Sequence, residues 1–154
     1  MTTKEIKLKP GFVHRLSKDE DVKDRSLISK IIVNKRLTKA LEGLEDFSHI
    51  HVLFYMHEIP TEETKTLKVH PRGRTDLPLV GVFATRSAHR PNPVGLTLVQ
   101  LIERKENVLV VKGLDALDGT PVLDVKPFDN WDMASDYRVP EWNKRIHEKD
   151  NRTH

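Results

Sequence analysis

The residues best suited to chemistry lie in residues 81–97, where two arginines, two prolines and an asparagine separate two apolar segments. Arg86 and Arg90 are permanent cations, and a planar guanidinium suits a carboxylate or a phosphate. Pro91 and Pro93 fix φ, remove backbone donors and bias the preceding residues toward extended geometry. A simple hairpin loop needs neither pair, so this composition favours a rigid loop at a polar site over a stiff, solvated turn.

A second candidate is the segment Asp118-Gly119-Thr120-Pro121. Gly119 permits a positive φ, and Pro121 restricts the chain where the segment ends. The pattern allows two interpretations. It could be an ordinary Asp-Gly turn between strands, or a loop whose backbone groups and carboxylate bind a ligand.

Histidines and basic residues upstream of the arginine–proline run add further candidates. His49, His51 and His57 fall on one face of an expected strand, and two histidines at i and i+2 could hold a metal. The sequence places no third ligand beside them, so we expect packed or surface histidines and no metal. Arg72 and Arg74 lie in a basic, glycine-containing segment that could contact an RNA backbone or form a solvated loop.

Strands must position these residues, because apolar and β-branched runs recur along the chain. They are expected at residues 6–15, 26–33, 48–57, 79–85, 94–103, 107–112 and 122–126. In the clearest of them, alternation places Ile50, Val52 and Phe54 on one face and histidines on the other. Residues 37–44 have the spacing of a short helix, and residues 58–78 are expected to form a long loop.

The fold class that follows is mainly β. We expect a single-domain, closed or nearly closed β-barrel of about six or seven strands with little helix, since closure removes exposed strand edges. Residues 1–140 are assigned to the barrel domain and residues 141–154 to a charged C-terminal tail, which we expect to fray from residue 144 onward. Apolar residues that follow the last strand are expected to pack onto the body of the protein: Trp131, Met133, Tyr137, Val139 and Trp142.

Composition limits the class of protein. The 154 residues, 32% of them charged and 37% apolar, are enough for one domain with a core. No apolar stretch approaches the roughly 20 residues of a membrane-spanning helix, no apolar signal region opens the chain, and cysteine is absent. We therefore expect a cytoplasmic protein without a membrane segment. A net charge of +3 gives a mild bias toward polyanions.

Three segments, in the same order, resemble the TsaA-like (TrmO) family of S-adenosylmethionine-dependent tRNA methyltransferases. They are LEGLEDFSHIHVLFYMH at 41–57, GVFATRSAHRPNPVGLTLVQL at 81–101 and LDALDGTPVLDVKPF at 114–128. The resemblance implies a β-barrel that binds S-adenosylmethionine near a homodimer interface. It also implies that the methyl acceptor is the exocyclic N6 of threonylcarbamoyl-adenosine beside the tRNA anticodon. The absence of a glycine-rich loop between a strand and a helix agrees, because it argues against a Rossmann methyltransferase.

The resemblance further implies roles for single residues. The cofactor-binding set is His57, Glu58, Arg86, Leu96, Asp118, Gly119, Thr120 and Pro121. Substrate binding or ordering of the loop falls to Ser87, Arg90 and Asn92, to which we add Arg72 and Arg74 from the basic segment. Asp118, His57 and Asn92 are candidates for the catalytic group, and the sequence does not decide among them. From residue type alone, Leu96 could instead be core and Arg86 a structural ion pair.

The chain departs from the family pattern in several places. Glu58 stands where glutamine is frequent, and Ala88-His89 is a variant pair within the central motif. Residues 17–25 are rich in charge where a short Pro-Arg loop often contributes to the pocket. The best-known bacterial members carry a second, C-terminal domain associated with tRNA, so we expect the short form of the family here.

Other functions stay open. The chain could be a non-catalytic sensor of S-adenosylmethionine or a nucleotide, or a methyltransferase with a different small or RNA acceptor. An RNA-binding barrel without enzymatic activity ranks lowest, because aromatic residues make up only 6% and Phe54 and Phe83 lie in apolar strand patterns. A scaffold protein would leave the arginine–proline run without a purpose.

Overall fold

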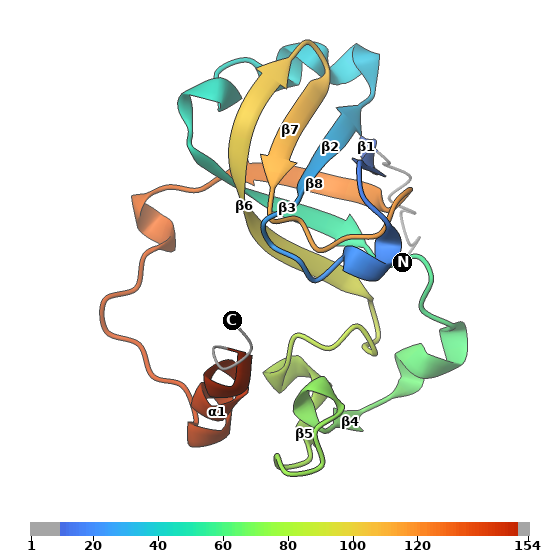
Figure 1. Ribbon diagram of the computed structural model, residues 1–154, viewed down its shortest axis with the longest axis vertical. Coiled ribbons are helices and arrows are strands. Elements are labelled where there is room, and N and C mark those ends of the chain that lie inside the picture. Colours follow the sequence, from blue (N-terminus) through green and yellow to red (C-terminus); the bar gives the residue numbers. More distant parts are fainter. Residues whose placement is uncertain (1–9, 151–154) are drawn as a thin grey trace, which may run out of the picture.

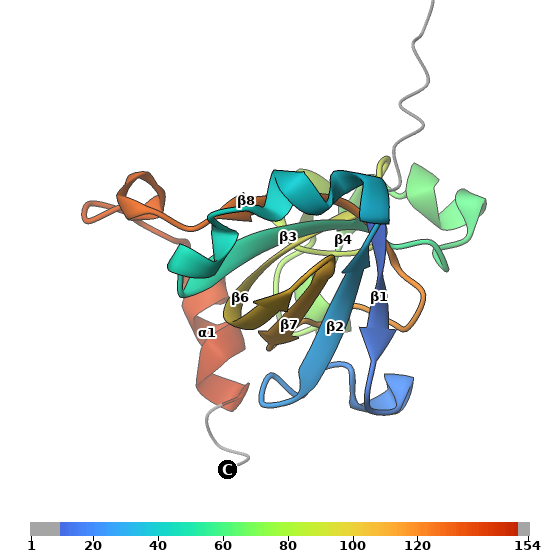
Figure 2. The same ribbon diagram turned by 90° about the horizontal axis from the view of Figure 1, so that it is seen from above.

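Six antiparallel strands close into a barrel in the computed structural model, which describes residues 10–150. They are β1 (Gly11–Arg15), β2 (Ile28–Val33), β3 (His49–Tyr55), β6 (Val94–Lys105), β7 (Val108–Lys112) and β8 (Pro121–Pro127). Their order around the barrel is β1-β2-β7-β6-β3-β8, and two views at right angles show the closed wall (Figures 1 and 2). The predicted mainly-β, closed barrel is confirmed, while residues 6–9 of the expected first strand lie outside the described residues.

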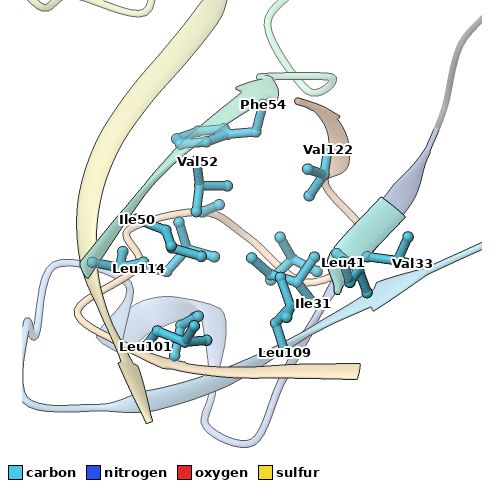
Figure 3. Packing of buried hydrophobic residues seen from close by; sticks show 14 residues of the cluster. Ile31, Val33, Leu41, Ile50, Val52, Phe54, Leu101, Leu109, Leu114 and Val122 are labelled. Atoms are coloured by element: carbon cyan, nitrogen blue, oxygen red, sulfur yellow. The ribbon is translucent and has the colours of Figure 1, made fainter. Parts of the chain in front are cut away.

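Alternation along the strands builds the core. On β3 the exposure pattern alternates, so that Ile50, Val52 and Phe54 point inward as predicted. Side chains from every wall of the barrel meet them, and Figure 3 shows these groups turned toward one another. The buried cluster comprises Val13, Ile31, Val33, Leu41, Ile50, Val52, Phe54, Val99, Leu101, Leu109, Val111, Leu114, Ala116 and Val122. Burial of such side chains stabilises a fold by about 1.5–3 kcal/mol each.

Short 3-10 helices, rather than an α-helix, connect β2 to β3. The expected helical segment forms as η2 (Lys35–Leu41) and η3 (Leu44–Asp46), interrupted at Gly43, whose φ is +89°. From η3, Glu45 reaches β6 and accepts two hydrogen bonds of 2.8 Å from Arg104. The Arg104 guanidinium lowers the pKa of Glu45 from 4.5 to about 2, and Glu45 raises the pKa of Arg104 in return. Another 3-10 turn, η1 (Asp19–Asp21), lies between β1 and β2.

A long excursion separates β3 from β6. It contains η4 (Thr61–Lys65), β4 (Lys68–Val69), η5 (Pro71–Gly73), β5 (Val80–Gly81) and η6 (Val82–Ala84), with β4 and β5 paired as a small separate sheet. The strand expected over 79–85 is therefore wrong, apart from the two residues of β5. It ends because the backbone N–H and the hydroxyl of Thr85 both donate to the carbonyl of Val82, which closes a turn.

The C-terminal part leaves the barrel and returns to the excursion. After η7 (Asn130–Asp132), the chain forms helix α1 (Glu141–Asp150), which contacts Arg74 and Asp76 of the excursion (Figure 1). Arg145 of α1 lies 3.4 Å from the carboxylate of Asp76, and Ile146 is buried. A helix therefore occupies much of the expected tail, and the division at residue 140 stays a prediction. Trp131, Met133 and Tyr137 are 95%, 70% and 75% exposed, so the expectation that they pack onto the body is wrong for these three, whereas Trp142 on α1 is partly buried.

No helix in residues 10–150 is both long and apolar enough to span a membrane.

Candidate functional site

Strand register brings the predicted site segments to one end of the barrel. On β3, Leu53 lies opposite Leu96 of β6 on one side and Asp124 of β8 on the other. The end of β3 therefore adjoins the start of β6 and the start of β8. His57 follows β3, the arginine–proline run precedes β6, and Asp118-Gly119-Thr120-Pro121 leads into β8. Three segments far apart in sequence thus meet at this end.

The motif loop, residues 85–93, is held by bonds among its own atoms and by contacts outside it, from His89 to Glu63 at 2.7 Å and from the Met56 N–H to the carbonyl of Pro93 at 2.8 Å. Arg90 donates from Nη1 to the carbonyls of Thr85 (3.0 Å) and Ser87 (3.2 Å). The Ser87 N–H donates to the Thr85 hydroxyl, and the Ser87 hydroxyl accepts from the His89 N–H. Arg90 and Ser87 thus make hydrogen bonds within the loop, and the two prolines restrict the same stretch, while the role of Arg90 and Ser87 in substrate binding or loop ordering stays a prediction.

Arg86 and Leu96 lie together where the motif loop meets β6. The guanidinium of Arg86 is exposed, and its Nη1 donates to the carbonyl of Leu96 over 3.4 Å. Leu96 is 46% exposed on the outer face of β6, so the alternative that it belongs to the core is excluded. A cation and an apolar side chain on one open surface can bind a ligand that has an acidic group and an apolar part.

Gly95, which lies between Pro93 and Leu96 in the sequence, is required by packing. Its position opposite Phe54 brings the phenyl ring against the strand backbone, and an added Cβ would overlap that ring. The glycine lets Phe54 fill the barrel end directly beneath the motif loop.

The anchored loop, residues 113–121, is held by the barrel instead. Asp118 accepts from the Arg15 N–H over 2.9 Å, and its own N–H donates to the Asp19 carboxylate over 2.8 Å. Gly119 has a φ of +76°, and its N–H donates to the carbonyl of Val13. The Val13 N–H in turn donates to the carbonyl of Thr120, whose side chain is buried. Asp118 therefore already makes hydrogen bonds that hold the anchored loop in place.

Arg15 is a residue of the site region that sequence reasoning missed. Its side chain is only 1% exposed, and its Nη1 donates to the carbonyl of Ala116 over 3.2 Å. Its Nη2 donates to the hydroxyl of Ser17 over 2.9 Å, and Asp19 lies 3.6 Å from its Nε. One buried cation therefore joins the anchored loop to the loop after β1. The sequence did contain a signal for this burial. Residues 13 and 15 of a strand point to the same face, so Arg15 faces the barrel interior together with Val13.

Thr97 and Asp115 form a second missed contact. The Thr97 hydroxyl, on the inner face of β6, donates to the Asp115 carboxylate over 2.5 Å. Arg25 contacts the other oxygen of that carboxylate at 3.2 Å. Thr97 directly follows Leu96, so this bond joins the anchored loop to the strand that carries the exposed leucine.

The histidines do not form a metal site in the part of the chain that the structure describes. His57 lies 4.0 Å from Glu58 and is one-third exposed, whereas His51 faces Asp132 at 3.4 Å and Phe128. His49 pairs with the hydroxyl of Ser48. Among residues 10–150, no group of three potential metal-ligating side chains occurs.

The basic segment is partly engaged in internal contacts. Arg74 donates to both carboxylate oxygens of Asp76, over 3.1 and 2.7 Å, and to the carbonyl of Arg145 on α1. Arg72 is exposed and adopts a positive φ of 53°. Arg74 therefore fastens α1 to the excursion, whereas the predicted RNA contact of Arg72 and Arg74 stays a prediction. The predicted role of Asn92 also stays a prediction. Asn92 is exposed, and its backbone carbonyl accepts a hydrogen bond from the Val94 N–H.

Comparison with known proteins gives consistent results. A family model described as the tRNA-methyltransferase O N-terminal domain matches residues 19–132. A probable S-adenosyl-L-methionine-binding protein of Methanothermobacter thermautotrophicus is 50% identical over 100 residues, 65% of this chain and 69% of that protein. A protein of Pyrococcus abyssi with the same description is 35% identical over 89% of this chain and 76% of its own length. The mouse tRNA (adenine(37)-N6)-methyltransferase is 43% identical over 70% of this chain but only 23% of its own length.

Solved structures agree with the sequence comparisons. A crystal structure of TrmO superposes with a TM-score of 0.67 at 30% identity, covering 93% of this chain and 73% of that chain. TrmO from Pseudomonas aeruginosa superposes with a TM-score of 0.65 at 30% identity, covering 84% of this chain and 58% of that chain. The resemblance in the three sequence segments is thereby confirmed. The chain belongs to the tRNA-methyltransferase O family of S-adenosylmethionine-dependent tRNA methyltransferases.

Proposed function

We propose that this protein transfers the methyl group of S-adenosylmethionine to the exocyclic N6 of threonylcarbamoyl-adenosine beside the anticodon of tRNA. The observation that carries the proposal is that the motif loop and the anchored loop lie at the same barrel end, where Thr97 of β6 bonds to Asp115 of the anchored loop. The mouse relative is named a methyltransferase of adenine 37 of tRNA, and archaeal relatives are named S-adenosyl-L-methionine-binding proteins. Membership of the same family supports the same reaction class here.

The side chains at this end suit the cofactor. Exposed Arg86 could bind the carboxylate of the methionine moiety, and exposed Leu96 could lie against an apolar part of the ligand. Gly119 has open space where a Cβ would stand, which allows a ligand close to its backbone, and Asp118 offers a half-exposed carboxylate to hydroxyl groups. His57 would complete this binding surface, with Glu58, Thr120 and Pro121 as the remaining predicted contacts.

The bound cofactor would supply a methyl group on a sulfonium. The protein residues would align the acceptor nitrogen with the methyl group and exclude water from the site. One of them would accept the proton that the nitrogen loses. Asp118 already accepts a hydrogen bond from the Arg15 N–H, which supports a positioning role. His57 is one-third exposed and lies 4.0 Å from Glu58, and its side chain makes no hydrogen bond within residues 10–150, so it is the better candidate for the proton acceptor. Asn92 could orient the base, since an amide both donates and accepts.

A homodimer is part of the proposal. Leu96 stands with Val94 and Leu98 on the outer face of β6, and Tyr55 lies opposite Val94 on β3. These four side chains are between 37% and 46% exposed. A second copy of this chain packed there would cover the apolar face and shield the cofactor from water. Sedimentation analysis tests this point, because a monomer at micromolar concentration would contradict it.

A methyl-transfer assay tests the reaction. The purified chain receives radiolabelled S-adenosylmethionine and tRNA from cells that do or do not install threonylcarbamoyl-adenosine. We expect label only in the modified tRNA, and loss of at least tenfold in the Arg86→Ala variant. Arg36→Ala is the matched control, because Arg36 is an exposed arginine on η2, outside the site segments. Label in both tRNAs would indicate a different RNA acceptor, and cofactor binding without label would indicate a sensor.

A further inference from the structure

Phe83 is the exposed aromatic residue nearest in sequence to the motif loop. The phenyl ring is 78% exposed, although its apolar context had predicted a strand. Phe83 belongs to η6, which its neighbour Val82 holds in place. The side chain of Val82 is buried, and its N–H donates to the carbonyl of Leu67. An exposed apolar side chain is common on protein surfaces and proves nothing alone. Its surroundings are the informative part.

Arg90 places a cation over this ring. The centre of its guanidinium lies 5.8 Å from the centroid of Phe83, within the range of a cation–π contact. The two carbonyls that accept from Nη1, those of Thr85 and Ser87, prevent the guanidinium from swinging away. No hydrogen bond is recorded for its Nε or Nη2 within residues 10–150. We call Phe83 and Arg90 together the stacking platform.

Within residues 10–150, other strongly exposed aromatic residues lack a cation held over the ring. Trp131 is 95% exposed and lies between Asp129 and Asp132 in the sequence, whereas Tyr137 lies between Asp136 and Arg138, whose charges oppose each other. Carboxylates repel a phosphate backbone, whereas the cation beside Phe83 attracts it. The composition of the stacking platform therefore favours a nucleic-acid ligand in a way that these residues do not.

We propose that the stacking platform binds an unpaired base of the RNA substrate. The base would stack on the Phe83–Arg90 pair, and the open edge of the guanidinium would contact the adjoining phosphate. Single-stranded RNA loops are recognised in this way, through bases splayed onto aromatic rings and guanidinium planes. The inference rests on the proposed function, since it assigns the RNA contact of the same site. It also places an RNA-binding role on a residue that had counted against RNA binding.

The test uses a 17-nucleotide anticodon stem-loop that carries 2-aminopurine in its loop, titrated with the full chain. Stacking should quench the 2-aminopurine fluorescence. Phe83→Ala should abolish the quenching and raise the RNA dissociation constant about 5- to 150-fold, the effect of losing one stacked base. Phe83→Tyr should retain both signals, because it keeps the ring. Leu67→Ala is the matched control, since Leu67 is a 75% exposed apolar residue on the same excursion.

Two further measurements separate this inference from its rivals. Calorimetric titration should give the same S-adenosylmethionine affinity for Phe83→Ala as for the wild type, and sedimentation should give the same oligomeric state. An unchanged RNA dissociation constant in Phe83→Ala would overturn the proposal. A changed oligomeric state would also overturn it, because the ring would then belong to a protein interface. Quenching without methyl transfer to any tRNA would refute the proposed reaction while leaving the stacking platform intact.

Discussion

The motif loop and the anchored loop meet at the same barrel end but are held in opposite ways. In the motif loop, the hydrogen bonds of Arg90 and Ser87 span two to five residues. In the anchored loop, the bonds from Arg15 and Asp19 join residues 99 to 103 positions apart. The motif loop therefore takes much of its shape from local sequence, supplemented by the contacts of His89 with Glu63 and of Pro93 with Met56, whereas the anchored loop depends mainly on bonds to β1 and to the loop that follows it. Damage to the barrel should therefore disorder one half of the site before the other.

Replacing Arg15 should have the largest effect. Arg15→Met keeps an apolar stem but leaves the carbonyls of Leu114 and Ala116 without their buried donor. We expect a loss of about 2–4 kcal/mol in the free energy of unfolding, measured in urea, together with weaker cofactor binding. Arg36→Met, an exposed arginine on η2, should change the free energy by less than about 0.5 kcal/mol. Equal stabilities for the two variants would contradict the anchoring role.

Replacing Thr97 should have a smaller effect on the same loop. Thr97→Val preserves the shape of the side chain and removes only the hydroxyl that donates to Asp115. Because Arg25 still pairs with that carboxylate, we expect a loss of about 1–2 kcal/mol. Thr38→Val serves as the control, since its hydroxyl donates to a nearby carbonyl on an exposed turn. A double-mutant cycle with Asp115→Asn measures the coupling, and zero coupling would argue against a direct bond.

Replacing Arg90 should loosen the motif loop and leave the barrel intact. Arg90→Met removes the two bonds to Thr85 and Ser87. We expect the free energy of unfolding to change by less than about 1 kcal/mol, while amide hydrogen exchange accelerates within residues 85–93. Mass spectrometry of the exchanged peptides measures both regions at once. Faster exchange in residues 113–121 as well would show that the two loops are not held independently.

The smallest expected effect lies outside both loops, at Glu45. Because Arg104 lowers the pKa of Glu45 from 4.5 to about 2, the pair stabilises the fold fully above pH 4.5. That contribution is lost as the pH falls from 4.5 toward 2. Glu45→Gln should therefore be less stable than the wild type at pH 7, and the difference should shrink across this window. Urea unfolding at several pH values measures it, and a difference that is constant with pH would contradict the assignment.

The sequence predicted the locally determined features and missed the distant ones. The arginines and prolines of the motif loop reveal a rigid loop because their constraints act within a few residues. The buried role of Arg15 depends on carbonyls about a hundred positions away, and only its inward parity with Val13 hinted at it. The strand expected at 79–85 failed because the turn closed by Thr85 outweighed the apolar pattern. Helix α1 was missed because its own composition is polar, and contacts with Asp76 and Arg74 hold it.

The seam of the barrel has a consequence for any ligand of the anchored loop. Within residues 10–150, strands β1 and β8 pair through two residue pairs, Gly11 with Val122 and Phe12 with Pro121. The hydrogen bonds from Val13 to Gly119 and Thr120 extend that seam directly into the loop. A ligand held by the loop and the opening of the seam are therefore thermodynamically linked, since each state that binds the ligand must also be closed. Part of the free energy of ligand binding would therefore appear as a lower population of barrels opened at the seam between β1 and β8.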